Sequence, residues 1–137
     1  MRYGVLITLA LGLGCYAEGP GSIAVRGKLG QHAGKPAVET AEHKLLYLDG
    51  DEPTRGVLND KRLAGADLEA QGHFTAPDRF QVDPIHTRAL RVHQDGKAKL
   101  VTYWCDTCSI RTWTPGQCWC CQQETALDLK DPDALPQ

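Results

Sequence analysis

The chain has 137 residues, with 15 basic and 17 acidic side chains and a formal net charge of −2, and it contains no long basic run of the kind that binds nucleic acid. Its length suits one domain with a modest core, and no apolar stretch reaches the roughly 20 residues that a transmembrane helix needs. We therefore expect no nucleic-acid partner. Of the six cysteines, all but Cys15 lie between positions 105 and 121, so the chemistry of the chain is expected there.

The first residues have the pattern of an export signal. Met1-Arg2-Tyr3 carries one basic side chain, and the run from Gly4 to Gly14 carries no charge. A short basic start followed by an apolar core is typical of a secretory signal peptide, and the small residues Cys15 and Ala17 suit cleavage after Ala17. The pattern predicts a signal peptide over residues 1–17 and export to the periplasm or out of the cell.

Cys15 allows a second interpretation of this segment. The pair Gly14-Cys15 fits the end of a lipoprotein signal, although Gly12 stands where a leucine is usual. In that case Cys15 would carry a lipid and anchor the protein to a membrane. A membrane is an expected partner only under this alternative.

Beyond the export signal, short extended runs alternate with turns. Extended runs are expected at Ile23–Leu29, Ala37–Thr40, Lys44–Leu48, Asp67–Phe74, Arg79–Val82, Thr87–His93 and Ala98–Trp104. Turn-rich breaks are expected at Gly30–Pro36, Asp49–Pro53, Pro77-Asp78 and Thr114–Gly116. Asp95-Gly96 stands between the last two runs and is a strong hairpin signal. Residues 56–66 are the best candidate for a helical or irregular segment.

Many short strands at near-regular spacing predict a mostly β protein, either a small antiparallel barrel or a sandwich. We expect one β-rich domain over residues 18–130. Within it, residues 22–93 would form the barrel and residues 98–130 a cysteine-rich hairpin segment. A polar tail is expected over residues 131–137.

Part of the chain also resembles a known type of barrel. The segments that carry the resemblance are Val25–Leu29, Lys44–Leu48 and Leu63–Phe74. Their order is similar to that of secreted OB-like barrels in bacteria, where an opening strand ends in G-x-L and a later L-x-G leads into a strand ending in x-G-x-F. The resemblance covers roughly residues 22–85 and implies a five-stranded OB-like barrel. It implies no function, because one fold serves many functions.

The cysteines form two C-x-x-C pairs, Cys105 with Cys108 and Cys118 with Cys121, and Cys120 is an extra thiol. Two thiolates three positions apart on a tight turn both reach one ion at about 2.3 Å, and two such turns complete a tetrahedron. The segment resembles zinc-ribbon and rubredoxin-like sites. The spacing predicts a metal site at these four cysteines, with Cys120 as an alternative ligand.

Two features depart from the commonest sites of this kind. The stretch between the pairs, residues 109–117, is short for a zinc ribbon, and Ser109 and Gln122 stand where glycine is usual. Thiolates select zinc, iron or copper(I). Zinc is the expected ion because it needs no redox control, and copper(I) is the main competitor.

Two other interpretations of the cysteines stay open. In an oxidising compartment they would pair as disulfides that staple the domain without metal. Exposed C-x-x-C pairs would also suit a thiol–disulfide or copper-handling protein. No hydrolase or nucleotide-binding motif is present, so no catalytic residue is assigned. We expect a small exported binding or interaction protein, with a protein or small-molecule partner, rather than an enzyme.

Overall fold

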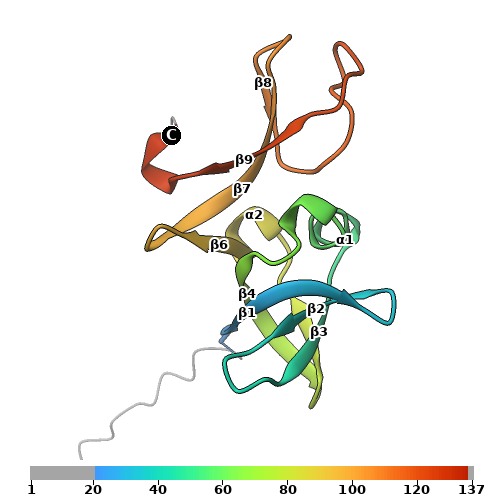
Figure 1. Ribbon diagram of the computed structural model, residues 1–137, viewed down its shortest axis with the longest axis vertical. Coiled ribbons are helices and arrows are strands. Elements are labelled where there is room, and N and C mark those ends of the chain that lie inside the picture. The colour runs from blue at the N-terminus through green and yellow to red at the C-terminus, as the bar shows by residue number, and fades with distance from the viewer. Residues whose placement is uncertain (1–20, 136–137) are drawn as a thin grey trace, which may run out of the picture.

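The computed structural model describes residues 21–135 (Figure 1). The strands are β1 (Ile23–His32), β2 (Lys35–Glu39), β3 (Leu45–Asp49), β4 (Asp67–Ala76), β5 (Arg79–Val82), β6 (Leu90–Gln94), β7 (Lys97–Cys105), β8 (Ile110–Thr112) and β9 (Ala126–Lys130). The helices are α1 (Glu52–Leu58) and α2 (His86–Ala89), and the 3-10 turns are η1 (Lys61–Leu63) and η2 (Pro132–Ala134). The signal peptide predicted over residues 1–17, and with it Cys15, lies outside the described residues. None of the described helices has the length and apolar character to cross a membrane.

The first five strands close into a barrel. β1 pairs with β2 and β4, β2 pairs with β3, and β5 lies between β3 and β4. This is the strand order expected of an OB-like Greek-key barrel, and the prediction of a mostly β barrel is confirmed. The pairing of β3 with β5 is parallel, so the sheet is mixed and not wholly antiparallel. The reason is that α1 and η1 carry the chain across the barrel after β3, and the β4–β5 hairpin then returns alongside it.

Strand β1 is longer than predicted and forms hydrogen-bonded pairs with two other strands. Residues 28–32 of β1 pair with β2, and residues 23–28 pair with β4. The strands cross closely at Gly27, where a Cβ atom would lie 2.4 Å from the Glu39 carbonyl oxygen. The predicted break at Gly30–Pro36 is wrong in extent, because Ala33 and Gly34, both with positive φ, turn the chain within two residues.

The helical segment begins earlier than predicted. Asp51 accepts a hydrogen bond of 3.0 Å from the Thr54 backbone amide and caps α1, and Pro53 occupies the first turn. The stretch Asp49–Pro53, predicted as a break, therefore contains the start of the helix. In the same way the predicted strand Thr87–His93 begins with α2, and only residues 90–94 extend as β6.

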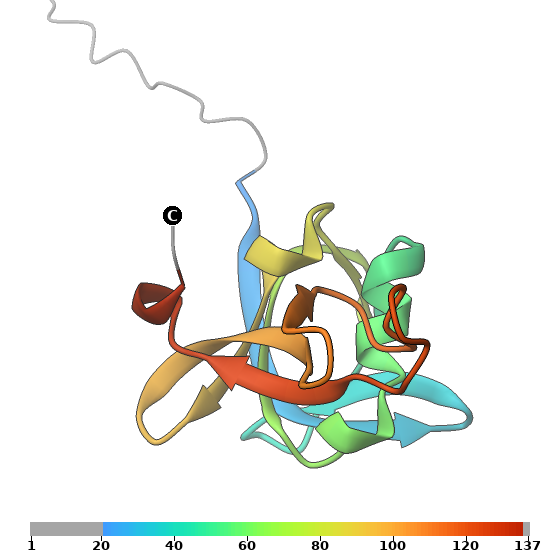
Figure 2. The ribbon, with the colours of Figure 1, turned by 90° about the horizontal axis from the view of Figure 1, so that it is seen from above.

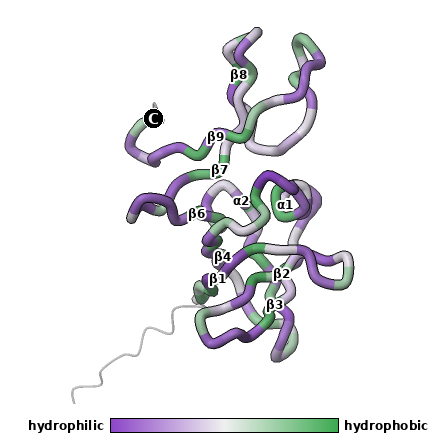
Figure 3. Tube along the Cα trace, viewed as in Figure 1, coloured by the Kyte–Doolittle hydropathy of each residue, from purple (hydrophilic) through white to green (hydrophobic). Residues whose placement is uncertain are grey.

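A second sheet is continuous with the barrel through strand β7. Strand β7 pairs with β6 at its beginning and then with β8 and β9. The side chains of Val101 and Tyr103 enter the barrel core, and Leu127 and Leu129 of β9 pack against it. Figure 3 shows apolar stretches along β2, β3, β7 and β9. The barrel and the second sheet thus share one hydrophobic core.

The cysteine-bearing turns lie at one end of the molecule. In Figure 1, β8 and the loop before β9 stand beyond α1 and α2. Seen along the perpendicular direction in Figure 2, they lie over one end of the barrel. The segment between Cys105 and Cys121 therefore lies at one end of the barrel, to which strand β7 connects it.

Candidate metal centre

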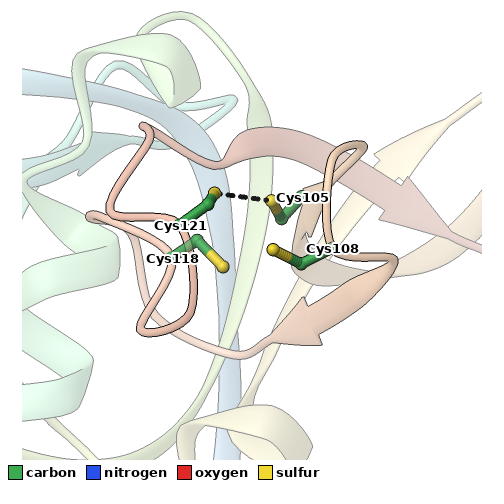
Figure 4. Close-up of side chains that lie close together, drawn as sticks. All are labelled: Cys105, Cys108, Cys118 and Cys121. Carbon is green, nitrogen blue, oxygen red and sulfur yellow. Dashed lines mark hydrogen bonds between the residues drawn. The ribbon is translucent and has the colours of Figure 1, made fainter.

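Four cysteine side chains converge on one point. The sulfurs of Cys105, Cys108, Cys118 and Cys121 all lie within 4.8 Å of one another (Figure 4). The Cys105 and Cys121 sulfurs are 3.5 Å apart. A tetrahedron with zinc–sulfur bonds of about 2.3 Å has sulfur–sulfur edges of about 3.8 Å. The four cysteines that the spacing selected are close enough together to hold a metal ion.

The first C-x-x-C pair is formed by the turn between two paired strands. Cys105 is the last residue of β7 and pairs with Ile110, the first residue of β8. The chain reverses between them, and Ser109 adopts the left-handed conformation with φ of 52°. Cys108 is placed on the inside of this turn, so both sulfurs point the same way (Figure 4).

The second pair lies in the loop before β9 and repeats the same geometry. The Cys118 amide donates to the Gln123 carbonyl at 2.7 Å, and the Gln122 amide donates to the Cys118 carbonyl at 2.8 Å. Gln122 has φ of 61°, again the left-handed region. Ser109 and Gln122, which stand in the usual glycine positions, therefore take the glycine-like conformation although they carry side chains.

Backbone amides face the first sulfur of each pair. Hydrogen bonds from the amides of Cys121 and Cys120 lower the pKa of the Cys118 thiol to about 7. The amide of Cys108 also hydrogen-bonds the Cys105 sulfur, but burial and the neighbouring thiols of Cys121 and Cys118 outweigh it and raise the pKa of Cys105. Such amides stabilise a thiolate, because N–H groups donate to the charged sulfur.

The other sulfurs are harder to ionise. The pKa of Cys108 lies well above its usual range because of the side chain of Cys120, burial, and the side chains of Cys121 and Cys118. Crowded thiols resist ionising together, since each thiolate disfavours the next. A divalent cation at their centre reverses this, because a coordinating thiol loses its proton outright.

The cluster is more deeply buried on one side than on the other. Cys118 and Cys105 are 0% and 3% exposed, whereas Cys108 and Cys121 are half-buried and Cys120 is exposed. Cys120 does not belong to the group of four, so its predicted role as an alternative ligand stays a prediction.

The aromatic residues near the cysteines have different surroundings. Tyr103 is fully buried in the core, and Trp119 is 76% exposed. Trp104 lies under the guanidinium of Arg111, whose carbon is 4.8 Å from the ring centre. Trp119 thus lies on the surface and does not shield the sulfurs from water.

Contacts that the sequence did not reveal hold the loop in place. Arg62 of η1 donates to the Thr125 carbonyl at 2.6 Å, and Thr125 in turn bonds the Gly116 carbonyl through its amide and its hydroxyl. The Thr107 hydroxyl donates to the Gln123 side chain at 3.0 Å and joins the two turns. Arg62 and Thr125 are far apart in sequence, and no spacing rule links them.

The barrel carries a separate concave surface. A groove of about 800 Å³ lies over β3, β5 and α1, and its charged lining residues include Lys35, Arg55, Arg79, Asp49 and Asp78. The mixture of charges selects no particular ligand. The groove is lined by none of the cysteines, so it is distinct from the sulfur cluster.

Comparison with known protein families, with curated proteins and with solved structures gives no match. The chemistry of the site therefore rests on the positions of its own residues.

Proposed function

We propose that the protein is a small exported binding or interaction protein whose cysteine-bearing segment is held by a structural zinc ion. The ligands would be Cys105, Cys108, Cys118 and Cys121. The observation that carries the proposal is the convergence of their four sulfurs within 4.8 Å. Four protein ligands fill a tetrahedral site and leave no open position for a substrate, which is typical of structural zinc.

Zinc accounts for more features of the site than disulfide bonds do. Each C-x-x-C turn aims backbone amides at its first sulfur. That arrangement stabilises a negatively charged thiolate, as a zinc ligand is, and gives much less to a neutral disulfide sulfur. Zinc is also favoured over iron and copper(I) because it holds thiolates in a tetrahedron without redox chemistry.

The ion would stabilise the fold by holding the two cysteine-bearing turns together. The two turns lie in separate segments, between β7 and β8 and before β9, and no residue from 106 to 125 belongs to the hydrophobic core cluster. Binding free energy of a structural zinc is folding free energy, because the unfolded chain has no preformed site. The metal would therefore hold the cysteine-bearing segment over the barrel.

In this proposal, the barrel and not the cysteine-bearing segment binds the partner. Its groove of about 800 Å³ offers a concave surface for a protein or small-molecule partner. Export is supported by the sequence of residues 1–17, and the net charge of −2 argues against nucleic acid as the partner.

The test uses reduced full-length protein stripped of metal. Zinc titration against a competing chelator is expected to give one site per chain, and cobalt(II) in its place is expected to give the visible absorption of tetrahedral thiolate coordination. Cys118→Ser is expected to weaken zinc binding by at least about a hundredfold, because it removes a buried ligand. Cys120→Ser is the matched control and should leave the affinity unchanged. Equal affinity in wild type and Cys118→Ser would contradict the proposal.

A further inference from the structure

One sulfur–sulfur contact in the cluster joins the two cysteine-bearing turns. The sulfurs of Cys105 and Cys121 are 3.5 Å apart, and Figure 4 shows this contact between the two turns. Cys105 ends β7, whereas Cys121 lies 16 positions later, in the loop before β9. A disulfide bond is about 2.05 Å long, so the remaining gap of about 1.5 Å is within reach of side-chain rotation. The two sulfurs are therefore placed to form a bond with each other as well as to share a metal ion.

Hydrogen bonds that involve no cysteine side chain keep the two turns side by side. The Thr107 hydroxyl of the first turn donates to the Gln123 side chain, next to the second turn, at 3.0 Å. The Arg62 guanidinium donates to the Thr125 carbonyl at 2.6 Å and fixes the second loop to the barrel. Neither contact needs a metal. The two turns therefore stay close together when the site loses its ion.

The two sulfurs in contact differ in how easily a solute reaches them. Cys105 is 3% exposed, whereas Cys121 is half-buried. A small oxidant in solution, such as hydrogen peroxide, therefore meets the Cys121 sulfur first. A thiolate that is oxidised to a sulfenic acid condenses with a neighbouring thiol to give a disulfide. The contact thus gives the accessible sulfur of Cys121 a buried partner in Cys105.

We propose that the four-cysteine site is a site of oxidative modification by peroxide, at which oxidation joins Cys105 to Cys121 and releases the metal. The proposal rests on the proposed function, because the release requires a metal held by the four cysteines. The ligand set is the same in both proposals, and the new element is the reaction of one particular pair within it.

The reaction consumes one hydrogen peroxide and two protons. The Cys121 thiolate first attacks the peroxide, so that a sulfur–oxygen bond forms, the oxygen–oxygen bond breaks, and the departing hydroxide takes up a proton. The Cys105 thiolate then attacks the oxidised sulfur, so that the sulfur–sulfur bond forms, the sulfur–oxygen bond breaks, and a second hydroxide takes up a proton. The two thiolates lose two electrons, and the peroxide is reduced to two water molecules.

The oxidised site keeps the turns joined but no longer holds the metal. Cys108 and Cys118 remain as thiols, and two thiolates do not complete the tetrahedron of a structural zinc site. The disulfide links the end of β7 to the loop before β9, the same two segments that the metal would join. The result of oxidation is therefore the release of the ion with the segment still in place. A thiol reductant reverses the change by thiol–disulfide exchange.

The test treats reduced, zinc-loaded full-length protein with one equivalent of hydrogen peroxide. The remaining thiols are blocked with N-ethylmaleimide, and the protein is denatured and digested with trypsin. Arg111 lies between the two C-x-x-C pairs, so cleavage after it separates them. A disulfide between Cys105 and Cys121 is expected to join the two tryptic peptides, and fragmentation by mass spectrometry locates the bond. A disulfide within either C-x-x-C pair leaves the peptides separate.

Metal release is measured on the same samples by native mass spectrometry. Peroxide is expected to convert the zinc-loaded chain into one that lacks the zinc and two hydrogens, whereas untreated protein keeps its zinc. Dithiothreitol followed by fresh zinc is expected to restore the starting mass. Cys120→Ser removes the exposed thiol outside the group of four and is the matched control. It is expected to form the same disulfide and to lose its zinc to the same extent.

The outcomes separate this proposal from the proposed function. If the wild type binds no zinc in the titration, both fall. If it binds zinc but keeps it after peroxide treatment, only the oxidative release is overturned. A disulfide that maps within one C-x-x-C pair or to Cys120 also overturns it, as does a Cys120→Ser variant that no longer responds, because the reacting pair would then not be Cys105 and Cys121.

Discussion

Arg62 Nη1 donates a hydrogen bond of 2.6 Å to the backbone carbonyl of Thr125, and this contact fastens the cysteine-bearing loop to the barrel. The same guanidinium pairs with Asp60, whose side chain is 7% exposed. It also lies over the Tyr103 ring, 5.2 Å from the ring centre. One side chain of η1 thus contacts the loop, the core and a nearly buried carboxylate.

Replacing Arg62 is expected to destabilise the protein well beyond the effect of losing a surface charge. Arg62→Ala leaves the Asp60 carboxylate without its cation and frees the Thr125 carbonyl, at a cost of about 2 kcal/mol in the free energy of unfolding. The measurement is chemical denaturation of the metal-loaded protein.

Arg26 provides the matched control. It pairs with Asp67 on the surface, where the two side chains are 52% and 44% exposed. Solvent screens such a pair, so Arg26→Ala is expected to cost less than about 1 kcal/mol. Equal losses for Arg62→Ala and Arg26→Ala would show that the loop is not fastened through Arg62.

The left-handed residues of the two turns predict a stabilising substitution. Gln122 has φ of 61° and its amide closes the second turn. A side chain in this conformation costs roughly 1 kcal/mol, which glycine avoids. Gln122→Gly is therefore expected to raise the melting temperature of the metal-loaded protein.

Glu124, in the same loop but without a positive φ, serves as the comparison. Glu124→Gly is expected to lower stability by about 0.5–1 kcal/mol, because glycine there only adds freedom to the unfolded chain. A drop in stability for Gln122→Gly of the same size would show that the left-handed turn is not formed in solution.

Local patterns account for the parts of this structure that the sequence predicts. The hairpin turn at Asp95-Gly96 and each C-x-x-C turn depend on residues within a few positions of one another. The hairpin turn joins β6 to β7 as predicted, although β6 begins at Leu90 and not at Thr87, and the four paired cysteines lie close together. The start of α1 was missed because Pro53 and its neighbours look like a break, whereas Asp51 caps a helix that begins at Glu52 and has that proline in its first turn.

Long-range relationships explain the rest. The parallel pairing of β3 with β5 depends on how α1 crosses the barrel, which no local pattern encodes. The contact of Arg62 with Thr125 joins residues whose separation gives no periodic signal. The sequence did not predict strand β9, because Ala126–Lys130 is short and half polar. These residues adopt an extended conformation because they pair with β7.

The buried hydroxyl of Tyr103 leads to a third prediction. Tyr103 is fully buried, and among the described residues its hydroxyl has no hydrogen-bond partner. Burial, and after it the Asp60 carboxylate, raises the pKa of Tyr103. Because an unpaired buried hydroxyl is costly, Tyr103→Phe is expected to be neutral or to stabilise the protein by up to about 1 kcal/mol in chemical denaturation.

Tyr103→Ala separates the ring from the hydroxyl. Removing the ring leaves a cavity in the shared core and is expected to cost about 3–5 kcal/mol. If Tyr103→Phe instead loses more than about 1 kcal/mol, the hydroxyl makes a hydrogen bond that stabilises the fold.

The metal itself is tested most directly by native mass spectrometry of the protein expressed from its full sequence, with residues 1–17 included, and purified without reduction. We expect one zinc ion per chain, with Cys105, Cys108, Cys118 and Cys121 as unoxidised thiolates. A chain without metal, whose mass is short by two hydrogens for each disulfide, would contradict it and identify the segment as disulfide-stapled.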